Sequence, residues 1–327
     1  METIHCVNHG IWVKEKKLST EKENQTFNIL AIDGGGIRGI VPAHILNSID
    51  GKLGISLNEN FQMLAGTSTG SIIVAGLACG ISTEEIANLY KSIGEKIFIK
   101  NESYWPKNIK PAFHSLYDNT NLKKTLKETF GDIKLGDIKK PLLIPSTDIG
   151  NGGVHVFKSN YCKHFTRDMD VLVCDAVLAS CSAPTFFDPT IVDEYALADG
   201  GLWANNPSLA AFIDAQRRLN IPADSIKILS VGTGHAKSFY GTDLEKKWGM
   251  LNGWQRQEFI SFILSLQSQS THNYLQLIMK EEHLLRLNFE SDLPLPLDDC
   301  TATKDLFSRA DKLFTYETEN IKAFFNC

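Results

Sequence analysis

Ser68 occupies the centre of a glycine-flanked pentapeptide, Gly66-Thr67-Ser68-Thr69-Gly70, which indicates a reactive hydroxyl. An apolar run precedes the pentapeptide and a run of small apolar residues follows it. This order predicts a strand, a sharp turn and a helix, the setting in which Gly-x-Ser-x-Gly forms a nucleophile elbow. The flanking glycines remove Cβ atoms that would collide in so tight a turn. Ser68 is therefore the candidate nucleophile, and the alternative is a flexible loop of small residues.

A glycine-rich loop that precedes the elbow is suited to stabilising negative charge. The segment Asp33-Gly34-Gly35-Gly36-Ile37-Arg38-Gly39 follows an apolar run that begins at Phe27. Consecutive glycines allow backbone N–H groups to converge on one point, and Arg38 adds positive charge nearby. The loop also satisfies Gly-x-Gly-x-x-Gly, but dinucleotide binding needs an acidic residue about 20 positions on, after a second strand. Asp50 closes an expected helix and Glu59 precedes the elbow strand, so an oxyanion hole is favoured.

A serine nucleophile needs a base, and two residues compete for that role. Asp199 ends a short expected strand and precedes two glycines, which in a parallel sheet directs it to the crevice of the elbow. A partly desolvated carboxylate can accept the serine proton directly, whereas a turn-forming Asp-Gly is the alternative. His235 would complete the order Ser, Asp, His of α/β-hydrolases. The elbow follows only the second recognisable strand, unlike that fold, so Asp199 is preferred and His235 is expected outside the reaction.

Strands and helices alternate along most of the chain. We therefore predict an α/β fold with a mostly parallel central sheet and helices on both faces. Residues 1–26 are expected to be an N-terminal extension, and residues 27–327 one catalytic domain whose last part is mainly helical. Expected strands are 27–33, 142–147, 154–158, 195–198 and 225–231, and expected helices include 42–50, 82–98, 121–130, a segment that Pro184 stops, and 207–218.

Composition excludes several classes of protein. A hydrophobic fraction of 43% and a charged fraction of 22% are those of an ordinary globular protein, and a net charge of −5 argues against a nucleic-acid polymer as partner. Seven cysteines without a C-x-x-C pair indicate reduced thiols in a cytoplasm, and argue against a disulfide scaffold and a zinc site. No signal peptide is evident, and residues 61–82 are expected to be core rather than a membrane span.

Positive charge is concentrated in one part of the chain. The range Lys91–Lys140 contains 11 Lys against 6 Asp and Glu, with aromatic residues interleaved. A solvated helical surface explains this pattern, and a patch that meets an anionic phospholipid surface is the alternative.

The motifs, in this order, resemble the patatin family of lipid acyl hydrolases, over about residues 27–234. The resemblance rests on Asp33 to Gly39, Gly66 to Gly70, Ala179-Ser180-Cys181-Ser182-Ala183-Pro184-Thr185-Phe186-Phe187, Asp199-Gly200-Gly201 and Gly232-Thr233-Gly234. It implies a patatin-like three-layer architecture. It also implies a Ser-Asp dyad, with Ser68 as nucleophile, Asp199 as general base, and Gly34, Gly35, Gly36 and Arg38 as the oxyanion hole.

The same resemblance implies cleavage of fatty-acyl esters of glycerophospholipids, without metal or cofactor. Some compact bacterial members of the family are antiphage effectors that a cyclic nucleotide switches on, so such an activator is an expected partner. We therefore predict a cytoplasmic serine lipid hydrolase that acts peripherally on the membrane. The alternatives are a soluble carboxylesterase with a Ser68, Asp199, His235 triad and a catalytically silent binding module.

Overall fold

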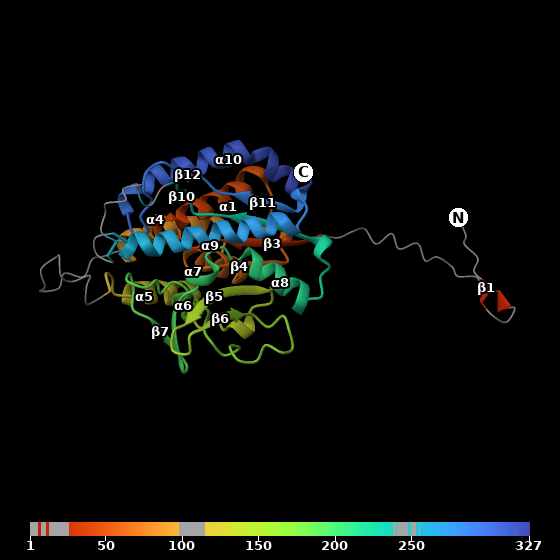
Figure 1. Cartoon of the computed structure of the whole chain (residues 1–327), viewed down its shortest axis with the longest axis horizontal. Helices are drawn as coiled ribbons and strands as arrows, with labels where there is room; N and C mark the ends of the chain where they lie inside the picture. The colour runs from red at the N-terminus through yellow and green to blue at the C-terminus, as the bar shows by residue number, and fades with distance from the viewer. Residues whose placement is uncertain are drawn as a thin grey trace, which may run out of the picture.

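The computed structural model of the chain describes residues 6–7, 11–12, 26–97, 115–237, 240, 248–249, 253–254 and 256–327 (Figure 1). Its main feature is an eight-stranded sheet in the order β11-β9-β3-β4-β5-β8-β7, with β6 also paired to β5. The strands are β3 (Phe27–Ile32), β4 (Met63–Gly66), β5 (Leu142–Asp148), β6 (Gly153–Lys158), β7 (Thr190–Val192), β8 (Tyr195–Asp199), β9 (Ile226–Val231) and β11 (Leu284–Leu287).

Most of this sheet is parallel, as the alternation of elements predicts. From β11 to β5 each neighbouring pair of strands is parallel, whereas β6 and β8 run antiparallel to β5, and β7 runs antiparallel to β8. Two short pairs lie outside the sheet. They are β1 (Cys6–Val7) with β2 (Ile11–Trp12), antiparallel, and β10 (His235–Ala236) with β12 (Glu290–Ser291), parallel.

Helices cover both faces of the sheet because its central strands are apolar on both sides. On β3, Leu30 and Ile32 enter one buried cluster, whereas Ile29 and Ala31 enter a second one. The first cluster includes residues of α1 (Ile40–Leu53), α3 (Thr69–Ala78), α4 (Thr83–Ile97), α5 (Thr120–Phe130), α6 (Val173–Ser180) and α10 (Thr303–Phe325). The second includes residues of α8 (Ser208–Arg218) and α9 (Arg256–Ile278). The predicted three-layer α/β fold is confirmed.

Short helical segments complete the described elements. Two of them are short α-helices, α2 (Leu57–Asn60) and α7 (Gly201–Ala204). The others are 3₁₀ turns, at Gly36–Gly39, Leu135–Asp137, Ala223–Ser225, Glu281–His283 and Cys300–Ala302. Local chemistry sets several of these boundaries. At the start of α4, the Glu85 carboxylate accepts a hydrogen bond from the Ser82 amide at 3.0 Å, and the Ser82 hydroxyl accepts one from the Glu85 amide at 3.2 Å. This is a capping box, as the sequence predicts.

The C-terminal part departs from the mainly helical expectation. Helices α9 and α10 are long, but β11 lies between them in sequence and joins the edge of the sheet beside β9. Helix α10 packs along α1, as Figure 1 shows. The run Leu-Leu-Arg-Leu is too short to show a strand periodicity, and only its pairing with β9 makes it a strand. The helix expected to continue to Pro184 also ends earlier, at Ser180.

The expected lysine-rich patch falls partly in residues 98–114, which lie outside the described residues. Among its described lysines, several are engaged within the protein. Lys134 pairs with Asp170 at 2.7 Å and Lys127 pairs with Asp132, while the half-buried Lys140 donates to backbone carbonyl oxygens, including that of Phe61 at 2.6 Å. These lysines are therefore occupied by internal partners. In the part of the chain that the structure describes, no helix has the length and apolar character that crossing a membrane requires.

Candidate active site

The pentapeptide forms the sharp turn that the sequence predicts between β4 and α3. Ser68 has φ 52° and ψ −126°, a strained conformation for a residue with a side chain. The turn requires glycine at both flanking positions because a side chain at either one would collide with the backbone. A Cβ on Gly66 would lie 2.3 Å from the Gly70 carbonyl oxygen, and a Cβ on Gly70 would lie 2.4 Å from the Ile32 carbonyl oxygen. Any other residue at either position would push the turn apart.

Hydrogen bonds from neighbouring elements hold the strained serine in place. The Ser68 amide donates to Ser180 Oγ at 2.9 Å, and the Ser180 hydroxyl donates in turn to the Pro145 carbonyl oxygen at 2.6 Å. The Ser71 hydroxyl donates to the Ser68 carbonyl oxygen at 2.6 Å. Ser180, at the end of α6, therefore positions Ser68 through its backbone, a role that the sequence did not assign.

Asp199 lies at the end of β8 and level with the elbow. In the sheet register, Ala65 of β4 pairs with Leu143 of β5, and Ser146 of β5 pairs with Asp199. The sequence analysis placed Asp199 near the elbow because parallel strands end at the same edge of a sheet. That reason is wrong for β8, because β8 runs antiparallel to β5. Instead, the short strand β8 ends at the level in the sheet at which the chain passes from β4 into the elbow. Register therefore brings the two residues together.

Burial gives Asp199 the properties of a base. The carboxylate is 3% exposed, and burial raises its pKa to about 6, while hydrogen bonding with the Ser68 side chain and the Gly201 amide lowers it. The Gly201 amide donates to Asp199 Oδ1 at 2.7 Å. A carboxylate with a pKa near 6 is ionised at neutral pH and is more basic than an exposed one.

The glycine-rich loop lies directly against the elbow. A Cβ on Gly34 would lie 3.1 Å from Ser68 Cβ, and Gly36 has φ +58°. The Gly34 amide donates to the Asn205 carbonyl oxygen at 3.0 Å, so in this conformation it is engaged. The Gly35 and Gly36 amides donate to no acceptor among the described residues. These two amides are therefore not engaged by the part of the chain that the structure describes.

The Arg38 guanidinium forms hydrogen bonds that hold the glycine-rich loop in place. Its Nε donates to the Gly35 carbonyl oxygen at 3.1 Å and another guanidinium nitrogen donates to the Gly234 carbonyl oxygen at 3.2 Å. Burial lowers the pKa of the guanidinium to about 10, and the neighbouring Asp33 raises it. The cation therefore orients the backbone of the loop through Gly35.

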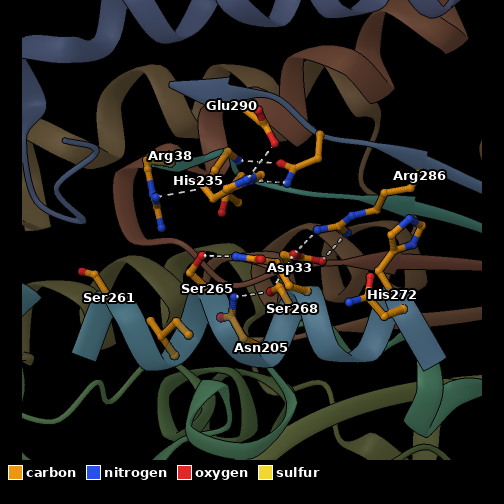
Figure 2. Close-up of a pocket in the computed structure, with 16 residues that line it drawn as sticks. Asp33, Arg38, Asn205, His235, Ser261, Ser265, Ser268, His272, Arg286 and Glu290 are labelled. Atoms are coloured by element: carbon orange, nitrogen blue, oxygen red, sulfur yellow. Dashed lines mark hydrogen bonds and ion pairs between the residues drawn. The ribbon is translucent and has the colours of Figure 1, made fainter. Parts of the chain in front are cut away.

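Asn205 is a site residue that the sequence analysis missed. Its Nδ2 donates to Ser268 Oγ at 2.9 Å, and Ser268 Oγ donates to Asp33 Oδ2 at 3.0 Å (Figure 2). Because a carboxylate only accepts, the one Ser268 proton goes to Asp33 and Ser268 must accept from the Asn205 amide. Asn205 Oδ1 therefore faces Gly34 and Gly201, where it has no donor among the described residues. The Asn-Asn-Pro that follows Asp199-Gly200-Gly201 was the available signal.

His235 is placed apart from this arrangement. Its Nε2 lies 3.3 Å from a Glu290 carboxylate oxygen, and its Nδ1 lies 3.3 Å from the side-chain nitrogen of Asn288. These partners come from the segment around β12. The histidine expected outside the reaction thus interacts with residues of another part of the fold. Among the described residues, no cluster of His, Cys, Asp and Glu is arranged to hold a metal ion.

Residues 30–212 match the family model described as patatin-like phospholipase. The chain belongs to this family. It is 30% identical to the cGAMP-activated phospholipase of Vibrio cholerae, over 90% of this chain and 92% of that protein. It is 28% identical to the cUMP-AMP-activated phospholipase of Escherichia coli, over 95% of each chain. Patatin-like protein 2 of Arabidopsis thaliana is 29% identical, over 74% of this chain and 69% of that protein. The predicted family is confirmed, and the protein is an enzyme that hydrolyses lipid esters.

Proposed function

We propose that this enzyme cleaves fatty-acyl esters of glycerophospholipids through an acyl-enzyme on Ser68, with Asp199 as general base. The observation that carries the proposal is the pairing of a strained serine at the elbow with a buried carboxylate whose pKa is raised to about 6. The two side chains are close enough for hydrogen bonding to influence that pKa. A serine next to a base of suitable pKa is the usual design of an activated nucleophile.

In the first half of the reaction, Asp199 accepts the Ser68 hydroxyl proton while Ser68 Oγ bonds to the acyl carbonyl carbon. The negative charge that develops on the carbonyl oxygen is stabilised by the amides of Gly35 and Gly36, supported by Arg38. The bond from this carbon to the glycerol oxygen then breaks. Asp199 returns its proton to that oxygen, and a lysophospholipid leaves.

In the second half, a water molecule donates a proton to Asp199 while its oxygen bonds to the acyl carbonyl carbon. The bond from that carbon to Ser68 Oγ then breaks, Asp199 returns the proton to Ser68 Oγ, and a fatty acid leaves. Asn205 Oδ1 supports this step because it is a buried acceptor without a donor on the same side of Gly34 as Ser68. A water bound there would give Asn205 its missing donor. We propose that Asn205 orients the water and that Asp199 activates it.

We also propose that a cyclic dinucleotide switches the enzyme on. Two relatives carry the names cGAMP-activated and cUMP-AMP-activated phospholipase. In addition, the dyad is covered. Ser68 is 9% and Asp199 3% exposed, and the buried Leu264 of α9 lies so close to Gly201 that a Cβ there would be 2.5 Å from it. A lipid ester is too bulky to reach Ser68 unless this cover moves.

We further propose that residues 27–327 act as one catalytic domain. The support is that β11 extends the central sheet and that α10 packs along α1. The enzyme would act on the membrane surface from the cytoplasm, since the substrate is a bilayer lipid.

Hydrolysis of mixed phospholipid vesicles tests the function. We expect release of fatty acid and lysophospholipid that increases when cGAMP or cUMP-AMP is added, and no release by the Ser68→Ala protein. Short-chain soluble esters serve as the comparison substrate. Cleavage of those esters with no action on vesicles under any condition would overturn the phospholipid proposal in favour of a soluble carboxylesterase. Failure of a covalent serine probe to label Ser68 would indicate a binding module instead.

A further inference from the structure

A cavity of about 300 Å³ lies beside the glycine-rich loop. We call it the polar pocket, and it is enclosed by Arg38, His235, Ser265, His272, Arg286 and Asn288 among others. Neither Ser68 nor Asp199 lines it. Figure 2 shows the loop and α9 on opposite sides of the space, with polar side chains directed into it from both. Two of its lining residues, Arg38 and Asn205, also take part in the proposed mechanism.

The face that α9 turns to the pocket is unusually polar for a helix that packs on a sheet. It carries Ser261, Ser265, Ser268 and His272, whose spacing of four, three and four residues places them on one side of the helix (Figure 2). The Nδ1 atom of His272 is buried and has no hydrogen-bond partner among the described residues. A buried polar atom without a partner is costly, so a polar ligand in the pocket would satisfy it.

A second cavity, of about 540 Å³, continues the polar pocket outwards. The two share His235, Ser265, Gln269 and Glu290. The outer cavity adds the aromatic rings of Tyr240 and Phe262, whose centroids lie 5.6 Å apart. Together the cavities fall within the range of about 300–1,000 Å³ that small-molecule sites occupy. Aromatic rings at the mouth are suited to stacking on a nucleobase.

The charges of the polar pocket narrow the class of ligand. Its lining contains two cations, Arg38 and Arg286, and two carboxylates, Asp33 and Glu290. Because these charges balance, the lining does not favour a ligand whose surface is mainly charged. The remaining lining is dominated by amides, hydroxyls and imidazoles, which read the edges of nucleobases through hydrogen bonds. A ligand with bases and a few spread charges fits this lining better than a bare phosphate.

We infer that the polar pocket and its outer cavity are the binding site of the cyclic dinucleotide activator. This inference rests on the proposed function, which supplies the class of activator. The amides of Asn273, Asn288 and Gln269 bind base edges, and a base stacks on the rings of the outer cavity. The guanidinium group of Arg38 faces a phosphodiester, since Arg286 is already paired with Asp33.

The pocket is joined to the oxyanion loop by a short hydrogen-bond network. Arg286 binds both carboxylate oxygens of Asp33, at 2.7 and 2.6 Å, and Asp33 immediately precedes Gly34. Arg38 and Asn205 line the pocket and also donate to carbonyl oxygens of the loop. A ligand that contacts these side chains therefore acts on the position of the loop amides.

The same pocket is joined to the cover of the dyad. Ser265 lines both cavities, and its neighbour on α9, Leu264, lies against Gly201 beside Asp199. A ligand that fills the pocket and shifts this part of α9 moves Leu264 as well. Binding thereby opens the dyad to lipid and moves the amides of the glycine-rich loop into position.

A charge change at the junction of the two cavities tests the inference. Gln269 and Gln276 lie on α9 with exposed side chains, and only Gln269 lines the cavities. We would measure binding of cGAMP and cUMP-AMP by calorimetry, in the Ser68→Ala protein so that no lipid is turned over. Gln269→Glu should raise Kd about tenfold or more, because it places a carboxylate beside an anionic ligand. Gln269→Lys should not weaken binding, and Gln276→Glu should change Kd less than twofold.

Equal binding by Gln269→Glu and Gln276→Glu would overturn the pocket assignment. In that case nucleotide-stimulated hydrolysis by the wild-type protein would still stand, and the activator would bind elsewhere. Absence of binding by either nucleotide, together with unstimulated vesicle hydrolysis, would overturn the activator and the pocket but leave the hydrolase. In the active protein, Gln269→Glu should raise the nucleotide concentration needed for half-maximal hydrolysis by the same factor as Kd.

Discussion

Asp33 and Asp199 are buried aspartates at the ends of two strands of the same sheet. They differ in whether a cation pairs with the carboxylate. Each follows a strand and precedes glycines, and they are 2% and 3% exposed. Asp33 has a bidentate partner in Arg286, whereas burial and hydrogen bonds alone determine the pKa of Asp199. The difference shows how this fold gives two buried carboxylates different affinities for a cation and for a proton. A carboxylate paired with a guanidinium is a structural anchor, and one left without a cation keeps a high affinity for protons.

The largest expected effect concerns the aspartate without a cation. Ser68→Ala and Asp199→Asn should each reduce phospholipid hydrolysis about 1,000-fold or more, because nucleophile and base act as one unit. His235→Ala, measured at saturating nucleotide, should lose less than about tenfold. Initial rates of fatty-acid release give the comparison. A loss in His235→Ala as deep as that in Ser68→Ala would replace the dyad by a triad.

The paired aspartate should instead control stability. Asp33→Ala leaves the Arg286 guanidinium buried without its partner, and we expect a loss of about 3–5 kcal/mol in the free energy of unfolding. Urea unfolding followed by circular dichroism measures it. Arg309→Ala, which breaks the Arg309–Asp305 pair on α10, is the control and should cost less than about 1 kcal/mol. Similar losses in both variants would contradict the role given to the Asp33 pair.

Removing the charge of Asp199 should instead increase the free energy of unfolding. Its pKa in the folded protein is about 6, above the ordinary aspartate value of 3.8, so the folded state binds the proton more tightly. Ionised Asp199 therefore destabilises the fold, fully above about pH 6 and not at all below about pH 4. Asp199→Asn should raise the free energy of unfolding by about 2 kcal/mol at pH 8. The gain should disappear at pH 4. A loss of stability at pH 8 would contradict the raised pKa of Asp199.

The smallest effect is the response of the rate to pH. The base must be ionised to accept the Ser68 proton, so kcat/KM should fall about tenfold for each pH unit below about 6 and reach a plateau above it. Vesicle hydrolysis at constant ionic strength between pH 4.5 and 8.5 would show this limb. A rate that stays constant down to pH 4.5 would mean that Asp199 is as well solvated as an ordinary carboxylate.

Local chemistry made part of this site predictable. The elbow at Ser68, the glycine-rich loop and the carboxylate at Asp199 each depend on residues within a few positions, and glycine and turn preferences are local. The strands β3, β5, β6, β8 and β9 were predicted close to their observed bounds for the same reason.

Long-range pairing made the rest unpredictable. The partner of Asp33 is Arg286, in a strand too short to recognise before it pairs with β9. The antiparallel direction of β8, the engaged amide of Gly34 and the orientation of Asn205 also depend on segments far apart in sequence. None of these leaves a periodic or compositional signal.

The pairing of Asp33 with Arg286 has a consequence for the order of folding. The two residues are 253 positions apart in sequence, so the pair joins two segments that are distant in the chain. Until Arg286 reaches it, Asp33 lacks the cation that offsets the cost of its burial. The glycine-rich loop that Asp33 begins therefore settles only after this long-range contact has formed.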